Sequence, residues 1–182
     1  VQGSGTIELT SSIALSDQVT IDSGKTIILD MNGETLSIGF SDSSKNLIVN
    51  NGTLTITGDG TFDATEATSY KGFINNYGTL TVENGTFQIA DKAMTVHLRN
   101  QDGGKAVING GTFSGGATIV RSFEGSNTTI TGGSFTNSVY PAVDVNGETL
   151  ITGGIFTNTS CSRCDSQNWG YTVRSGVDND PD

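Results

Sequence analysis

ITGGSFTN at residues 130–137 returns almost unchanged as ITGGIFTN at residues 151–158, after a step of 21 residues. A step of roughly 20 to 50 residues is typical of proteins that stack copies of one structural unit. The search for further copies therefore starts from the aromatic residue that closes each motif, Phe135 in the first and Phe156 in the second.

Three more segments end in the same way, and the intervals between the five closing Phe residues are 25, 26, 22 and 21 residues. Upstream, KTIILDMNGETL fits more loosely, with Leu36 in the Phe place, and GTIELTSSIAL is more degraded still. The sequence therefore holds about seven units, of which the first two are degraded. The complete motifs are GTLTITGDGTF to Phe62, GTLTVENGTF to Phe87, GKAVINGGTF to Phe113, NTTITGGSF to Phe135 and ETLITGGIF to Phe156.

Apolar residues alternate with polar ones inside each unit, as Leu54 and Ile56 do, and period two predicts a strand. A second apolar pair follows later in the unit, and Asn corners at Asn76, Asn100 and Asn146 come after it. A β-sandwich also contains many short strands, but its strands differ in sequence, whereas one sequence repeat of 21 to 26 residues recurs here. A unit too short to bury its own core must stack on its neighbours.

We therefore predict an all-β fold, a solenoid of about seven coils of 20–26 residues in which each repeat is one turn. Equivalent residues would then lie above one another at the strand spacing of about 4.8 Å. The expected domain spans residues 1–175, with degraded coils or a cap in 1–40 and a C-terminal cap in 157–175. Residues 176–182 form an acidic tail or the start of a linker.

Residues 25–62 carry two resemblances, one of architecture and one of repeat sequence; they contain KTIILDMNGETLSI followed by GTLTITGDGTF. The architecture resembles the right-handed, pectate-lyase-like parallel β-helix. The repeat phrases resemble the β-helical regions of large secreted bacterial surface proteins of adhesin-like type. The resemblance implies an extracellular or cell-surface module that binds a glycan or a host surface protein. The alternative is a purely structural stalk segment without a binding site.

The charge balance narrows the choice of partners. The chain carries 9 Lys and Arg against 19 Asp and Glu, a net charge of −10. Such a surface repels nucleic-acid phosphates and anionic lipid, so neither is an expected partner. No apolar run approaches the length of about 18 residues that spans a bilayer, so no membrane insertion is expected. The isolated domain is expected to be a monomer.

A column of outward residues after the second strand is the candidate ligand-binding face. Arg and Asp suit sugar hydroxyls or carboxylates. For Trp169 and Tyr171, near the C-terminus, a cap on the open end of the core is the favoured interpretation, and a sugar-stacking platform is the alternative. For the column, the alternative is an ordinary solvated face. Its predicted members are Asn75, His97, Arg121, Asp144 and Arg174.

A carbohydrate-active enzyme, lyase-like or glycosidase-like, is the alternative from another class. Glycosidases need two carboxylates at a defined separation, and the column offers one, Asp144. Asp30 and Glu83 lie two units apart and make no convincing pair. No cofactor and no metal site is expected, because no motif for either recurs. Cys161 and Cys164 are expected to form a short structural disulfide, with free thiols as the alternative.

Overall fold

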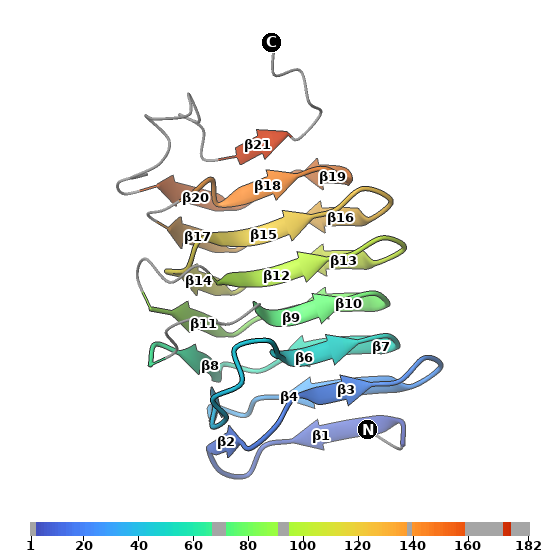
Figure 1. Ribbon diagram of the computed structural model, residues 1–182, viewed down its shortest axis with the longest axis vertical. Helices are drawn as coiled ribbons and strands as arrows, with labels where there is room; N and C mark the ends of the chain where they lie inside the picture. Colours follow the sequence, from blue (N-terminus) through green and yellow to red (C-terminus); the bar gives the residue numbers. More distant parts are fainter. Residues whose placement is uncertain (1–2, 67–71, 91–94, 138–139, 159–172, 176–182) are drawn as a thin grey trace.

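The computed structural model describes residues 3–66, 72–90, 95–137, 140–158 and 173–175 (Figure 1). Within these residues the chain forms 21 strands and no helix, and hence no helix that could cross a membrane. The strands wind into one parallel β-solenoid, in which each coil gives one strand to each of three seven-stranded sheets. The predicted all-β parallel stack is confirmed, and the coil count approximately matches.

Sheet A carries the Leu/Ile alternation that precedes the Gly turn. Leu54 and Ile56 are buried, whereas Thr55 and Thr57 face outward, so the period-two pattern is confirmed as a strand with one buried side. Leu54 pairs with Leu80 in parallel register. The strands are β1 (Gly5–Glu8), β4 (Thr26–Asp30), β7 (Thr53–Thr57), β10 (Thr79–Val82), β13 (Lys105–Ile108), β16 (Asn127–Ile130) and β19 (Glu148–Ile151).

Sheet B carries the closing aromatic residues. Phe62, Phe87, Phe113 and Phe135 stack ring on ring with centroids 4.6 to 5.0 Å apart, and Phe156 continues the stack at 4.7 Å. Leu36 pairs with Phe62, as the sequence predicts. The strands are β2 (Ile13–Leu15), β5 (Thr35–Ile38), β8 (Thr61–Ala64), β11 (Thr86–Ile89), β14 (Thr112–Ser114), β17 (Ser134–Asn137) and β20 (Ile155–Asn158).

Sheet C has a different burial pattern, because two consecutive residues point into the core. In β9, Phe73 and Ile74 are both buried, and only the next residue, Asn75, reaches the outer face before a buried Asn76. The strands are β3 (Val19–Ile21), β6 (Asn46–Asn50), β9 (Gly72–Asn76), β12 (Val96–Asn100), β15 (Thr118–Ser122), β18 (Val143–Val145) and β21 (Val173–Ser175).

The Gly-rich turn between sheets A and B exists because neighbouring coils come close there. Gly111 has φ of 98°, and an added Cβ would lie 3.0 Å from the Gly85 carbonyl oxygen of the coil below. A Cβ on Gly110 would lie 2.5 Å from the Glu83 carbonyl oxygen. The first position therefore requires the backbone freedom of Gly, and both positions lack room for a side chain.

Buried Asn side chains hold the corner after sheet C. Asn50, Asn76 and Asn100 are fully buried. The Nδ2 groups of Asn50 and Asn76 each donate to the Oδ1 atom of the Asn above, whereas Asn100 Nδ2 donates to Thr128 Oγ1. Ser122 takes the next position, where Val145 pairs with it. Asn146 follows β18 as predicted, but it lies one residue after the position of the buried column, which Val145 occupies.

Asn76→Ala is expected to lower the free energy of unfolding by about 2 kcal/mol, because it leaves buried hydrogen-bonding groups on both neighbouring coils without a partner. Asn76 Nδ2 donates to the Asn100 Oδ1 atom and to the Lys105 carbonyl, and Asn76 Oδ1 accepts from Asn50. The exposed Asn51→Ala is the control, with an expected change within about 0.5 kcal/mol. Urea unfolding measures both, and equal stability of the two variants would contradict the structural role of the Asn corner.

The ends of the stack are less regular. Strands β1 to β3 pair in register with the second coil, so the degraded first unit is still a full coil, although Ile7 and Ile13 are 40% and 46% exposed. At the other end β20 and β21 pair with the coil below. The rest of the expected cap and the tail at 176–182 lie outside the described residues.

Candidate functional site

Two neighbouring columns of side chains on the outer face of sheet C form the candidate site. Asn75, Arg99, Arg121 and Asp144 are successive pairing partners in β9, β12, β15 and β18. Two residues later in each coil come Tyr77, Gln101 and Phe123, each with its backbone N–H donating to the coil below. We call this set the sheet C strip: Asn75, Tyr77, Arg99, Gln101, Arg121, Phe123 and Asp144.

His97 does not belong to the strip, and its expected place on the ligand-binding face is wrong. Val96 pairs with Gly72 and Leu98 pairs with Ile74, so His97 lies at the level of the buried Phe73. Its side chain is 1% exposed. The residue that follows Asn75 in the outward column is Arg99.

The imidazole of His97 is part of the aromatic core. Its ring centroid lies 5.5 Å from that of Phe73 and 6.0 Å from that of Phe113. Nε2 lies 3.2 Å from the Gly115 carbonyl oxygen, whereas Nδ1 has no hydrogen-bond partner in the described part of the chain. Burial lowers the pKa of His97 to about 4, against a weaker opposing effect of the backbone hydrogen bond to Gly115. His97 is therefore neutral at pH 7.

The misplacement of His97 has an identifiable cause. Aligning the second strand on its first apolar residue sets Val96 beside Ile74, whereas the structure sets Leu98 there. Aligning on the buried corner residues instead gives the observed register, because Asn76 and Asn100 pair. That signal is present in the sequence, and it would have identified Arg99.

Two arginines share one aromatic ring at the centre of the strip. The guanidinium carbons of Arg99 and Arg121 lie 5.2 Å and 5.3 Å from the ring centroid of Phe123. Such cation–π contacts orient a guanidinium group while leaving its N–H donors available. Burial, and then repulsion from Arg121, lower the pKa of Arg99, although an arginine stays charged at neutral pH.

Asp144 partly neutralises this pair. Its Oδ2 atom lies 3.3 Å from Arg121 Nε, and the side chains of Arg121 and Asp144 are 41% and 16% exposed. No ion pair to Arg99 occurs within the described ranges. The centre of the strip therefore presents two cations and one carboxylate, and the Arg121 side chain is partly open to solvent although its Nε atom is buried.

The other end of the strip is neutral. Gln101 Nε2 donates to Asn75 Oδ1 at 2.5 Å, and Asn75 Nδ2 donates to the Tyr77 hydroxyl at 3.3 Å. Tyr77 is 47% exposed. An amide pair beside an exposed phenol offers donors, acceptors and an apolar ring, which together suit polar, ring-shaped ligands.

The remaining predicted site residues lie at the C-terminal end. Arg174 pairs with Asp144, so its backbone continues the outward column as predicted. Trp169, Tyr171, Cys161 and Cys164 lie outside the described residues, and the platform and the disulfide stay predictions.

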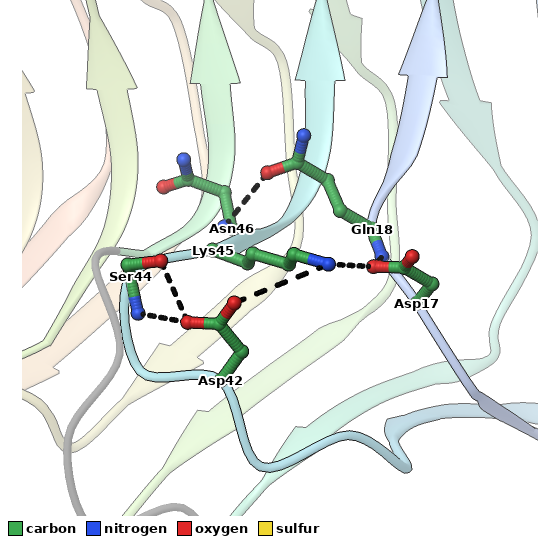
Figure 2. A network of polar contacts seen from close by, with 6 residues as sticks. All are labelled: Asp17, Gln18, Asp42, Ser44, Lys45 and Asn46. Carbon is green, nitrogen blue, oxygen red and sulfur yellow. Dashed lines mark hydrogen bonds and ion pairs between the residues drawn. The ribbon is translucent and has the colours of Figure 1, made fainter.

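A second polar cluster ties a loop to the first coil (Figure 2). Lys45 Nζ lies 2.6 Å from Asp17 Oδ1 and 4.0 Å from Asp42 Oδ2, and Ser44 donates to Asp42. The hydrogen bond from Lys45 lowers the pKa of Asp17, and the one from Ser44 lowers that of Asp42. Lys45 holds Asp17 and Asp42 together, and hydrogen bonds within the cluster engage both carboxylates, which indicates a structural role for the cluster.

The acidic residues of sheet A are also engaged locally. Asp30 accepts from the Asn32 backbone N–H at 3.0 Å, and Glu83 accepts from Asn109 at 3.0 Å. Among the residues that the structure describes, no three His, Cys, Asp or Glu side chains gather as a metal site. Among the polar arrangements described above, the sheet C strip therefore offers a ligand the most charged, polar and aromatic groups.

Three parallel sheets in one stack define the chain as a parallel β-solenoid protein. An arginine–aromatic patch lies on one of its outer faces. Comparisons with known protein families, with characterised proteins and with solved structures gave no significant match. The class therefore rests on the strand register itself.

Proposed function

We propose that the chain is an extracellular module of a bacterial surface protein, adhesin-like in its role, and binds a glycan or a host surface protein through the sheet C strip. The observation that carries the proposal is the pair Arg99 and Arg121 held on Phe123 at an outer face. In a chain of net charge −10, two half-buried cations clustered on an outer face are not explained by solubility. Arginine and aromatic residues are also the types enriched where binding energy concentrates.

Binding is favoured over catalysis by the number of carboxylates in the strip. Its columns hold one carboxylate, Asp144, and that group is paired with Arg121. Glycoside hydrolysis by the usual routes requires a second carboxylate about 5 to 10 Å away. A pectate-lyase-like enzyme is accordingly the weaker proposal, and a stalk without a binding face is the remaining one.

Arg121→Ala is expected to abolish or strongly reduce retention on a glycan array or on host cells, because it removes the exposed cation of the strip. Lys105→Ala is the matched control, since it removes one exposed cation from sheet A. Retention of wild type and of the control, with loss of the Arg121 variant, supports the proposal. Retention that is indifferent to Arg121 excludes this face, and no retention of wild type on any glycan or cell surface favours the stalk.

A further inference from the structure

Resting on the proposed function, we infer that the strip binds a glycan that ends in a single carboxylated sugar of the sialic-acid type, with the carboxylate between Arg99 and Arg121. The charge of the strip favours an anionic ligand. Arg99 and Arg121 are pairing partners on adjacent coils, and both contact Phe123. Asp144 contacts Arg121, which leaves one positive charge without a counter-charge in the described part of the strip.

The geometry suits a carboxylate in particular. A guanidinium group presents a planar fork of donors that matches the two oxygens of a carboxylate. Adjacent coils lie about 4.8 Å apart, so one carboxylate can accept from both arginines at once. Because Phe123 already orients both guanidinium groups, little side-chain entropy remains to be lost on binding.

The residues directly beside the two arginines in the column disfavour a second negative charge there. Beyond Arg121 the column continues with Asp144, which repels a second carboxylate. Below Arg99 it continues with Asn75, which is neutral and bonded to Gln101 and Tyr77. A polyuronate or an acidic peptide, with charges in succession, would place its next carboxylate beside Asp144 or on neutral groups.

The neutral end of the strip favours a sugar over a peptide. Tyr77 and Phe123 occupy the same outer column two coils apart, which is about 10 Å along the axis and comparable to the length of a disaccharide. Gln101 lies between them in that column. Hydroxyl and acetamido groups of the sugars that follow the charged one would find amide partners and the exposed Tyr77 ring there.

The test uses isothermal titration of the 182-residue chain with four probes: 3′-sialyllactose, lactose, trigalacturonate and triglutamate. Sialyllactose is expected to bind at least about tenfold more tightly than the other three, since a hydrogen bond to a charged group contributes a factor of about ten or more to affinity. Arg99→Gln and Arg121→Gln are each expected to weaken sialyllactose binding by about tenfold. Lys105→Gln, on sheet A, is expected to leave it unchanged.

Asp144→Asn is expected to change the affinity in the opposite direction. It frees Arg121 and removes a nearby negative charge, so sialyllactose is expected to bind severalfold more tightly, whereas a merely structural ion pair gives no gain. Equal binding of lactose, or indifference to Arg99, overturns the inference. Tighter binding of trigalacturonate or triglutamate replaces it with a polyuronate or an acidic peptide. If array glycans bind in an Arg121-dependent manner and sialyllactose does not, the inference fails while the proposed function stands.

Discussion

Phe113→Ala is expected to lower the free energy of unfolding by about 4 kcal/mol, the largest stability change of any substitution considered for this chain. Phe113 is 3% exposed and lies between Phe87 and Phe135, with ring planes within 9° and 2° of parallel. Its removal loses the buried area, opens a cavity in a close-packed column, and breaks two aromatic pairs worth about 0.5–1.5 kcal/mol each. Urea unfolding followed by circular dichroism measures the change.

Two control variants separate the aromatic column from a general loss of side-chain bulk. Phe113→Leu is expected to cost only about 1–2 kcal/mol, because Leu36 already occupies the equivalent position in the second coil. Thr112→Ala, at the exposed neighbouring residue, is expected to change stability by less than about 0.5 kcal/mol. A Phe113→Ala variant as stable as Thr112→Ala would mean that Phe113 is not in the core.

His97→Leu is expected to remove a pH dependence of stability worth about 3 kcal/mol. Burial lowers the pKa of His97 from its ordinary value of 6.5 to about 4 in the folded chain. Because the folded pKa is lowered, its contribution is fully present above about pH 6.5 and is lost as the pH falls from there through about 4. A gap of about 2.5 pKa units corresponds to about 3 kcal/mol. Leu is the natural replacement, since Leu47 and Ile119 occupy the same level in β6 and β15.

The measurement is urea unfolding of wild type and variant at about pH 8 and pH 4. Carboxylates titrate in both proteins, so the difference between the two pH profiles isolates His97. Wild type is expected to lose about 3 kcal/mol more than His97→Leu over this range. Parallel profiles would show that His97 is hydrated in the folded chain, which contradicts its place between Phe73 and Phe113.

Much of the fold could be predicted from the sequence because the repeat is strongest where the packing is strictest. The turn before each Phe contains at least one Gly, several of which leave no room for a side chain, and the Phe rings stack directly, so these positions recur and fix the register of sheets A and B. Even Leu36, in a degraded unit, is placed correctly against Phe62.

Sheet C could be predicted only in part, for a physical reason. Two consecutive buried residues, such as Phe73 and Ile74, break the alternation that identifies the outward positions. The alignment therefore placed His97 outside and missed Arg99. Phe123 was missed because it follows the strand, at a corner whose sequence changes from Tyr77 to Gln101 to Phe123. Arg121 and Asp144 were paired correctly because both units keep Val at the preceding position.

The central claim is that equivalent residues of successive coils lie directly above one another. Nuclear Overhauser effects between selectively labelled Phe rings test it most directly, because the chain has 8 Phe and five of them belong to one column. We expect an unbroken series of ring-to-ring contacts from Phe62 through Phe87, Phe113 and Phe135 to Phe156. Isolated rings, or the close Hα–Hα contacts of antiparallel strands at these residues, would contradict it.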